Sequence, residues 1–200
     1  MSKKKISGEC LILGCGNSTG VPVLGCSCEV CHSEDPRNHR SRPSVLIRCG
    51  KTSLLIDAGP DIREQLLRES ITEIHGVFIT HSHYDHTGGL DDLRILALFQ
   101  QQAIPMWVGE ETYIDLEKRM DYLIHSNITV GVPFKRFSIE KFVGDCGECR
   151  FDGFSWRYFL YTHSGVPVYG MRIGDFAYVT DIREYPESIF EELRGVRTLV

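Results

Sequence analysis

A run of six residues, His81-Ser-His83-Tyr-Asp85-His86, contains three imidazoles and one carboxylate. It directly follows an apolar, strand-like segment, residues 76–80. Imidazole and carboxylate groups together suit Zn, Mn or Fe. Two histidines one residue apart can reach one ion, while the adjacent Asp-His pair turns toward a second. A histidine-rich surface turn is the alternative, but four ligand-type residues between a strand and a glycine pair favour a metal site. The chain therefore has to fold around a metal-binding turn at the end of a buried strand.

Three further segments end on residues of the same ligand type. Asp57, His163 and Asp181 each close a short apolar or aromatic-rich run. Loops at strand ends carry chemistry while the sheet beneath holds them still. Polar residues at four successive strand ends thus predict one metal cleft at the rim of a sheet.

In their order along the chain, these residues resemble the metallo-β-lactamase superfamily of hydrolases. The resemblance implies an α/β fold, the αββα sandwich, with two divalent transition metals, Zn or Mn, in a cleft at one edge. It implies that Asp57 supports the site by hydrogen bonding rather than by ligation. The implied ligands are His81, His83 and His163 for the first metal, Asp85 and His86 for the second, and Asp181 as a bridge.

A glycine-rich segment, residues 13–20, leads into a second motif of three thiols, Cys26, Cys28 and Cys31. This region is similar to the amino-terminal part of the phosphoribosyl cyclic phosphodiesterase group. The resemblance implies that the three thiols bind a structural zinc, and a tight turn can aim three thiolates at one tetrahedral ion. His32 is a candidate substitute for the fourth ligand, although its neighbour Cys31 strains that geometry. Three reduced surface cysteines are the alternative.

In the group that the chain resembles, the sequence pattern continues beyond the position of Asp181 with a segment that carries two more histidine ligands. No such segment follows Asp181 in this sequence. We therefore expect a truncated form or a fragment that lacks its carboxy-terminal portion. Residues 194–200 read as the start of a buried strand. The second metal is then short of a ligand; His125 or a residue of another subunit is a less favoured substitute.

Composition agrees with one enzyme domain over residues 1–200. The chain is 42% hydrophobic and 24% charged, which is ordinary globular usage. Its net charge of −5 argues against nucleic acid as the main partner. No apolar run approaches a membrane span and no signal-peptide core is present, so we expect a cytoplasmic protein with reduced or metal-bound cysteines. The resemblance is compatible with a homodimer.

The apolar patterning predicts alternating strands and helices. Strands are expected at residues 9–13, 44–48, 52–56 and 104–108, and repeatedly between Phe134 and Thr180. Helices are expected at residues 61–70, 91–102, 111–124 and 188–193. In the first helix, Ile62, Leu66 and Leu67 are expected to share the buried face.

Two smaller features have two interpretations each. Cys146 and Cys149 have metal or redox spacing, but a polar turn with an exposed thiol pair is favoured. A basic cluster is equally compatible with a solvated loop and with contact to a substrate phosphate; its members are Arg37, His39, Arg40 and Arg42.

These features favour a metal-dependent phosphodiesterase that cleaves a small cyclic or nucleotide-like phosphodiester with a metal-bridged hydroxide. Asp85 is the expected catalytic residue, because it stands where it can orient the nucleophile or accept its proton. The alternatives are another hydrolase of the superfamily (a thioesterase, a lactonase or an RNA-processing nuclease) and a metal-binding fragment without catalysis.

Overall fold

A computed structural model describes residues 8–125 and 135–200, and its first sheet has six strands in the order β1-β2-β3-β4-β5-β6. Strands β1 to β3 pair antiparallel, and β3 to β6 pair parallel. The strand bounds are Gly8–Gly14, Ser44–Cys49, Thr52–Ile56, Gly76–Phe78, Ile104–Val108 and Phe137–Lys141. The strands predicted at residues 44–48 and 52–56 are confirmed as β2 and β3, which form an antiparallel hairpin.

The second sheet has five strands in the order β11-β10-β9-β8-β7. Its strands pair antiparallel except for the parallel pair β10 and β11. In chain order from β7 to β11 the bounds are Cys146–Phe151, Phe154–His163, Val166–Ile173, Phe176–Tyr178 and Thr198–Leu199. The strands expected up to Thr180 are therefore present, while Phe134 lies outside the described residues.

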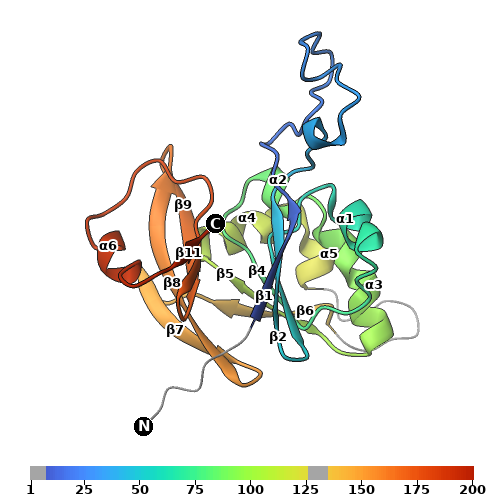
Figure 1. The fold of residues 1–200 in the computed structure, drawn as a ribbon. Helices are drawn as coiled ribbons and strands as arrows, with labels where there is room; N and C mark the ends of the chain where they lie inside the picture. Colours follow the sequence, from blue (N-terminus) through green and yellow to red (C-terminus); the bar gives the residue numbers. More distant parts are fainter. Residues whose placement is uncertain (1–7, 126–134) are drawn as a thin grey trace.

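Helices α1, α3 and α5 lie on the outer side of the first sheet and α6 on the outer side of the second, while the short α2 lies at the edge near the projecting loop (Figure 1). In chain order from α1 to α6 their bounds are Ile62–Arg68, Tyr84–Thr87, Leu90–Gln100, Glu110–Arg119, Asp121–Ile124 and Ile189–Glu192. A short 3-10 helix, Pro36–Asn38, stands in the loop that projects beyond the first sheet near α2. Helices, sheet, sheet and helix form the αββα sandwich, so the predicted fold is confirmed.

The alternation of side chains along the strands builds a layered core. Leu55 of β3 packs toward the helices, whereas its neighbours Leu54 and Ile56 pack toward the second sheet. The central strands are covered on both faces, which explains why β3 and β4 read as continuous apolar runs rather than as alternating ones. On the outer face of the second sheet, Ile189 of α6 packs near Phe159. This packing holds the strand ends rigidly.

Two helix predictions need correction. Leu67 is 59% exposed, because it stands five residues after Ile62 and points to the other side of α1. Gln65 takes the buried place, and its Nε2 donates to the carbonyl of Arg42 at 2.8 Å. The single helix expected at residues 111–124 is two helices, since the backbone leaves helical geometry at Met120 (φ −133°, ψ 39°).

Two predictions about strands are wrong. Cys146 and Cys149 lie in β7 rather than in a polar turn, and residues three apart on a strand point to opposite faces. The two thiols therefore do not face one ion. Residues 198 and 199 form the expected strand as β11, but both are exposed at the sheet edge rather than buried.

No helix in the described ranges is long and apolar enough to cross a membrane.

Candidate metal centre

The histidine run stands at the end of β4, where the parallel strands of the first sheet open onto its edge. His81 follows this strand, and α2 begins at Tyr84, so that Asp85 and His86 project from one helical turn. The rings of His81 and His86 lie 4.1 Å apart between centroids, and His81 Nε2 lies 2.9 Å from His83 Nδ1. The turn thus folds three imidazoles against one another, as the spacing predicted.

Asp57 is the buried support of this turn. It follows β3 with a φ of 60°, a left-handed conformation that aspartate adopts more readily than most residues. Its carboxylate is fully buried and accepts hydrogen bonds from Thr80 N, Thr80 Oγ1 and His86 Nδ1 at 2.8, 2.8 and 2.7 Å. Three donors hold the carboxylate in place, which is the supporting role expected of it.

Thr80 transmits that support to His81. Because its hydroxyl proton goes to Asp57, Thr80 Oγ1 accepts from His81 Nδ1, 2.9 Å away. The Nε2 atom of His81 is then left with a free lone pair, which is the form that ligates metal. Burial, followed by the charge of His86, lowers the pKa of His81 to about 4 and so keeps the ring neutral. The supporting role of Thr80 was not predicted. The signal for it in the sequence is a hydroxyl residue at the end of an apolar strand, next to the histidine run.

His86 Nε2 is the most unusual atom of the cluster. It is buried, and within the described residues it has no hydrogen-bond partner, yet carboxylate oxygens of Asp181 and Asp85 lie 3.1 and 3.3 Å away. Burial opposes a charge on this ring, but the charge of Asp57 and the contacts with Asp181 and Asp85 outweigh it and raise the pKa of His86 to about 12. The contact with His86 in turn holds the pKa of Asp181 well below its usual range.

The second sheet supplies the opposite wall. His163 ends β8, and its Nδ1 donates to the carbonyl of Asp181 at 2.8 Å. This bond leaves Nε2 of His163 available as a ligand. The ring lies 6.0 Å from that of His83 between centroids, so His163 faces the cluster from farther away. Asp181 has a φ of 51°, and its carboxylate reaches His86 across the gap between the sheets.

A cavity of about 530 Å³ opens over these side chains. Its lining includes His83, Asp85, His163 and Asp181, and the glycine-rich residues 14–18 border it. The glycine-rich segment, predicted only as a lead-in to the cysteines, is thus part of the wall. A small molecule that enters the cavity meets the imidazoles and carboxylates directly.

The donor atoms of the cluster fit divalent transition metals. Nitrogen ligands of a tetrahedral zinc, each about 2.0–2.1 Å from the ion, lie roughly 3.3 Å apart. The separations of 2.9 Å between His81 and His83 and of 3.1 Å between His86 and Asp181 are close to that spacing. Ligand atoms of His81, His86 and Asp181 all lie within 4.8 Å of one another. The Nε2 atom of His86 is buried and lacks a well-aligned hydrogen bond within the described residues, and two carboxylates lie within 3.3 Å of it, so a cation fits between them.

Metal binding is expected to release about one proton per chain from His86, because ligand nitrogens must be deprotonated. Its raised pKa keeps the ring protonated at neutral pH, so a metal at Nε2 replaces a proton. Metal affinity should therefore rise with pH across the neutral range. Calorimetric titration with zinc in buffers of different ionisation enthalpy measures this release, and an affinity that is flat or falls with pH would contradict it.

Arg119 of α4 is a second supporting residue that sequence reasoning missed. Its Nη2 donates to the carbonyl of Ser82 at 2.8 Å and lies 3.3 Å from Thr87 Oγ1. Thr87 Oγ1 in turn donates to the carbonyl of His83 at 2.9 Å. Because the contacts join residues 37 and 32 positions apart, no local pattern in the sequence marks them. Arg119 thus holds the backbone of the histidine run in place through Ser82 and Thr87, an arrangement called the Arg119 clamp below.

Arg119→Lys is expected to weaken metal binding at this centre by roughly tenfold, the range seen when support of a ligand is lost. Nη2 makes both contacts while Nε donates to Asp115 at 2.7 Å, so the planar guanidinium fixes the direction of Nη2, which a lysine ammonium cannot do. Competition with a chromophoric chelator measures the affinity. Arg94→Lys, in a comparable ion pair on α3, is the control, and equal affinities of the two variants would refute the clamp.

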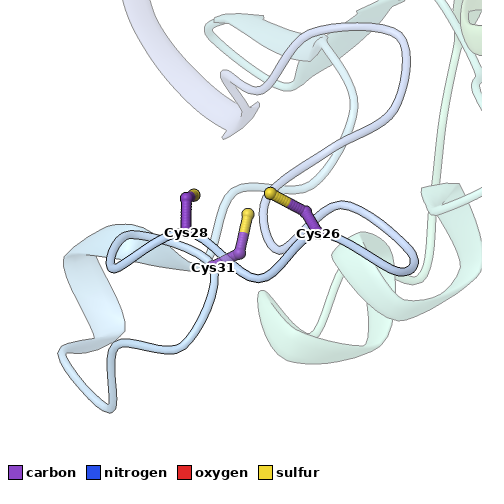
Figure 2. Close-up of side chains that lie close together, drawn as sticks. All are labelled: Cys26, Cys28 and Cys31. Atoms are coloured by element: carbon purple, nitrogen blue, oxygen red, sulfur yellow. The ribbon is translucent and has the colours of Figure 1, made fainter.

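The three predicted zinc thiols also come together, in the projecting loop (Figure 2). The sulfurs of Cys26, Cys28 and Cys31 lie within 4.8 Å of one another. Hydrogen bonding, first to the backbone of Cys31 and then to the Cys26 thiol, lowers the pKa of Cys28 to about 7, which favours the thiolate that binds metal. His32 is not in the group: its Nδ1 faces the carbonyl of Cys28 at 3.3 Å.

The other proposed substitute ligand, His125, is engaged elsewhere. Its Nε2 lies 2.7 Å from Glu117 Oε1, and it does not line the cavity over the histidine run. The structure thus brings the histidine run and Asp57 together with Asp181. His163 faces this cluster from the opposite wall. Cys146 and Cys149 point to opposite faces of β7 and form no common site.

Comparison with known proteins agrees with this arrangement. A family model described as the beta-lactamase superfamily domain matches residues 52–200. The solved structure of a diphosphatase from the PhnP family aligns with a TM-score of 0.85 and 34% identity, over 96% of this chain and 73% of that one.

Two curated proteins carry other activities in their names. The octanoyltransferase of Porphyromonas gingivalis is 35% identical over 196 residues, which are 96% of this chain and 38% of that protein. The ribonuclease Z of Chlamydia muridarum is 28% identical over 139 residues, 66% of this chain and 43% of that protein. The chain thus spans less than half the length of either. By its fold and by the family model that covers residues 52–200, the chain belongs to the beta-lactamase superfamily.

Proposed function

We propose that this chain is a metal-dependent hydrolase that cleaves a small cyclic or nucleotide-like phosphodiester, with two divalent transition metals in the cavity and a structural zinc on the cysteine loop. The observation that carries the proposal is the buried Nε2 of His86, which has no hydrogen-bond partner within the described residues and stands between Asp85 and Asp181. A divalent transition metal such as Zn or Mn suits this mixed nitrogen and oxygen donor set.

The proposed ligands fall into two overlapping groups. His81, His83 and His163 would hold one metal, while Asp85 and His86 would hold the other. Asp181 would bridge the two, because its carboxylate lies within reach of both His81 and His86. When bound, such metals lower the pKa of water and neutralise charge on phosphoryl oxygens.

The remaining steps belong to the chain's own residues. The carboxylate of Asp85 lines the cavity and is the group placed to accept a proton from the attacking water. In the metal-free chain, burial raises its pKa, but the contact with His86 outweighs burial and lowers it, so the carboxylate is ionised. Asp57, Thr80 and Arg119 keep the imidazoles oriented during this transfer.

Four observations favour a phosphodiester over other substrates. One solved structure at 34% identity is that of a diphosphatase from the PhnP family, a name that points to a phosphate-containing substrate. The resemblance of the cysteine loop points to the same phosphodiesterase group. The octanoyltransferase and ribonuclease Z names belong to proteins that this chain matches over less than half their length. The acidic net charge of −5 also disfavours an extended RNA substrate.

A hydrolysis screen tests the proposal. The metal-loaded chain is assayed with bis(p-nitrophenyl) phosphate, a 2′,3′-cyclic nucleotide, p-nitrophenyl octanoate, an acyl thioester, a homoserine lactone and a transfer-RNA precursor. We expect turnover of the phosphodiesters that is lost on chelation and restored by Zn or Mn. Turnover confined to the carboxylic esters or thioesters, or to RNA, would replace the phosphodiesterase by one of the alternatives, and no turnover of any substrate would favour a metal-binding protein without catalysis.

A further inference from the structure

Thr180 directly precedes Asp181, and its hydroxyl sets the direction of the aspartate side chain. Thr180 Oγ1 donates to Asp181 Oδ2 at 2.8 Å, and the same oxygen of Asp181 lies 3.1 Å from Nε2 of His86. The side chain of Asp181 is 33% exposed, so packing alone does not hold it. The hydroxyl of Thr180 therefore keeps a partly exposed carboxylate turned toward His86 instead of toward solvent.

The backbone of this turn is held from the end of β8. Tyr161 OH donates to the carbonyl of Thr180 at 2.6 Å, and His163 Nδ1 donates to the carbonyl of Asp181 at 2.8 Å. Asp181 has a left-handed φ of 51°, a conformation that costs free energy in a residue other than glycine and persists where its surroundings hold it. The two carbonyl contacts hold it here.

Tyr161 is a rigid base for its part of this arrangement. Its side chain is 1% exposed, and it belongs to the buried cluster of Phe159, Val168 and Ile189. A buried tyrosine hydroxyl needs a hydrogen-bond partner, and the carbonyl of Thr180 is that partner. The core of the second sheet is thus connected through Tyr161 and Thr180 to the carboxylate of Asp181.

The first sheet has a counterpart of this arrangement. Thr80 follows β4 and directly precedes His81, and its hydroxyl links Asp57 to the His81 ring. Thr180 follows β10 and directly precedes Asp181. On each sheet, a threonine after the strand therefore orients the ligand-type residue that comes next in the chain.

We propose that Tyr161 and Thr180 are positioning residues: Tyr161 fixes the backbone of Thr180, and the hydroxyl of Thr180 turns the carboxylate of Asp181 toward His86. The inference rests on the proposed function where it takes Asp181 as a metal ligand. A carboxylate that already points at the site loses less side-chain freedom when metal binds. Hydrogen bonds to a ligand of this kind also tune its affinity for the metal.

Two substitutions of Thr180 separate its hydroxyl from its packing. Thr180→Val keeps the size of the side chain, and we expect it to lower the zinc affinity of the histidine centre roughly tenfold. Thr180→Ser keeps the hydroxyl and should bind zinc as the wild type does. Competition with a chromophoric chelator measures the affinities in a Cys28→Ser background, which disables the cysteine loop.

Thr162→Val is the matched control for Thr180→Val. The hydroxyl of Thr162 lies 3.2 Å from Glu184 Oε2 in the same loop and has no bond to Asp181 in the described part of the chain. Its loss should leave zinc affinity unchanged. Equal affinities of Thr162→Val and Thr180→Val, or failure of Thr180→Ser to retain affinity, would overturn the role of the hydroxyl.

Tyr161→Phe tests the other half of the inference. We expect a several-fold loss of zinc affinity, and little further loss when Thr180→Val is added, because residues that act through one another are not additive. Tyr158→Phe is the control, since Tyr158 is also buried in β8 and donates to the carbonyl of Val143 at 2.9 Å. Equal losses of affinity in the two phenylalanine variants would refute the role of Tyr161.

A measurement on the metal-free chain separates this inference from the proposed function. Histidine-selective 15N labelling reports on Nε2 of His86, and we expect its NMR signal to move in Thr180→Val but not in Thr180→Ser or Thr162→Val. If phosphodiesters are hydrolysed while the signal and the zinc affinity of Thr180→Val match those of Thr162→Val, the positioning role is refuted and the proposed function stands. If the histidine centre binds no metal and the signal still depends on the Thr180 hydroxyl, the proposed function fails and the orientation of Asp181 by Thr180 stands.

Discussion

Asp85→Asn is expected to reduce phosphodiester hydrolysis by roughly a thousandfold, within the range for loss of general acid–base catalysis. The amide keeps the size of the side chain but removes the charge that ligates metal and accepts the proton. The carboxylate lines the cavity, and its Oδ2 lies 3.3 Å from Nε2 of His86, so both roles are open to it. Steady-state kinetics with bis(p-nitrophenyl) phosphate at saturating zinc or manganese measures the effect.

The control for this substitution is Asp92→Asn, an exposed aspartate in the first turn of α3. It removes the same charge at a site away from the cavity and should leave kcat near the wild-type value. Residual activity of Asp85→Asn above about a tenth of wild type would mean that Asp85 neither holds the metal nor handles the proton, since either role is worth far more.

Asp57→Ala is expected to lower the free energy of unfolding by about 3–5 kcal/mol in the metal-free chain, the cost of removing one partner from a buried ion pair. The carboxylate is fully buried, and His86, which it contacts at 2.7 Å, is equally enclosed. Removal also orphans the backbone N–H of Thr80. Urea denaturation, read by circular dichroism, measures the change.

Asp57→Asn separates charge from hydrogen bonding in the same position. The amide oxygen can still accept from Thr80, whereas the charge opposite His86 is gone, so an intermediate loss of stability is expected. A control is Asp35→Ala in the projecting loop, where the partner Arg37 is largely solvent-exposed and the pair contributes little. A loss below about 1 kcal/mol in Asp57→Ala would show that the buried pair is not what holds the turn.

Much of the centre follows from local sequence. The local backbone path of the run from His81 to His86 follows from its own sequence, because β4 ends just before it and one helical turn carries both Asp85 and His86. The expectation that ligand-type residues gather at strand ends also predicted that Asp57 and Asp181 lie beside the histidine run, and both contact His86. The fold class followed from the same residues through family resemblance, not from the apolar pattern alone.

What the sequence left open depends on contacts between distant segments. The clamp by Arg119 and the pairing of Arg42 with Asp61 are set by how helices pack on the sheet. Whether residues 146–149 form a turn or a strand is decided by β8, whose residues pair with them one by one. The break at Met120 likewise interrupts an otherwise continuous helical pattern.

The claim that His81, His83, Asp85, His86, His163 and Asp181 form a metal centre is tested most directly by metal content. Elemental mass spectrometry on Cys28→Ser, which disables the cysteine loop, counts the metals of the histidine centre alone. We expect about two divalent transition metals per chain, and a loss of this metal in the double variant Cys28→Ser, His83→Ala. A Cys28→Ser chain that is folded, exposed to excess zinc and manganese, and still free of bound metal would contradict the account.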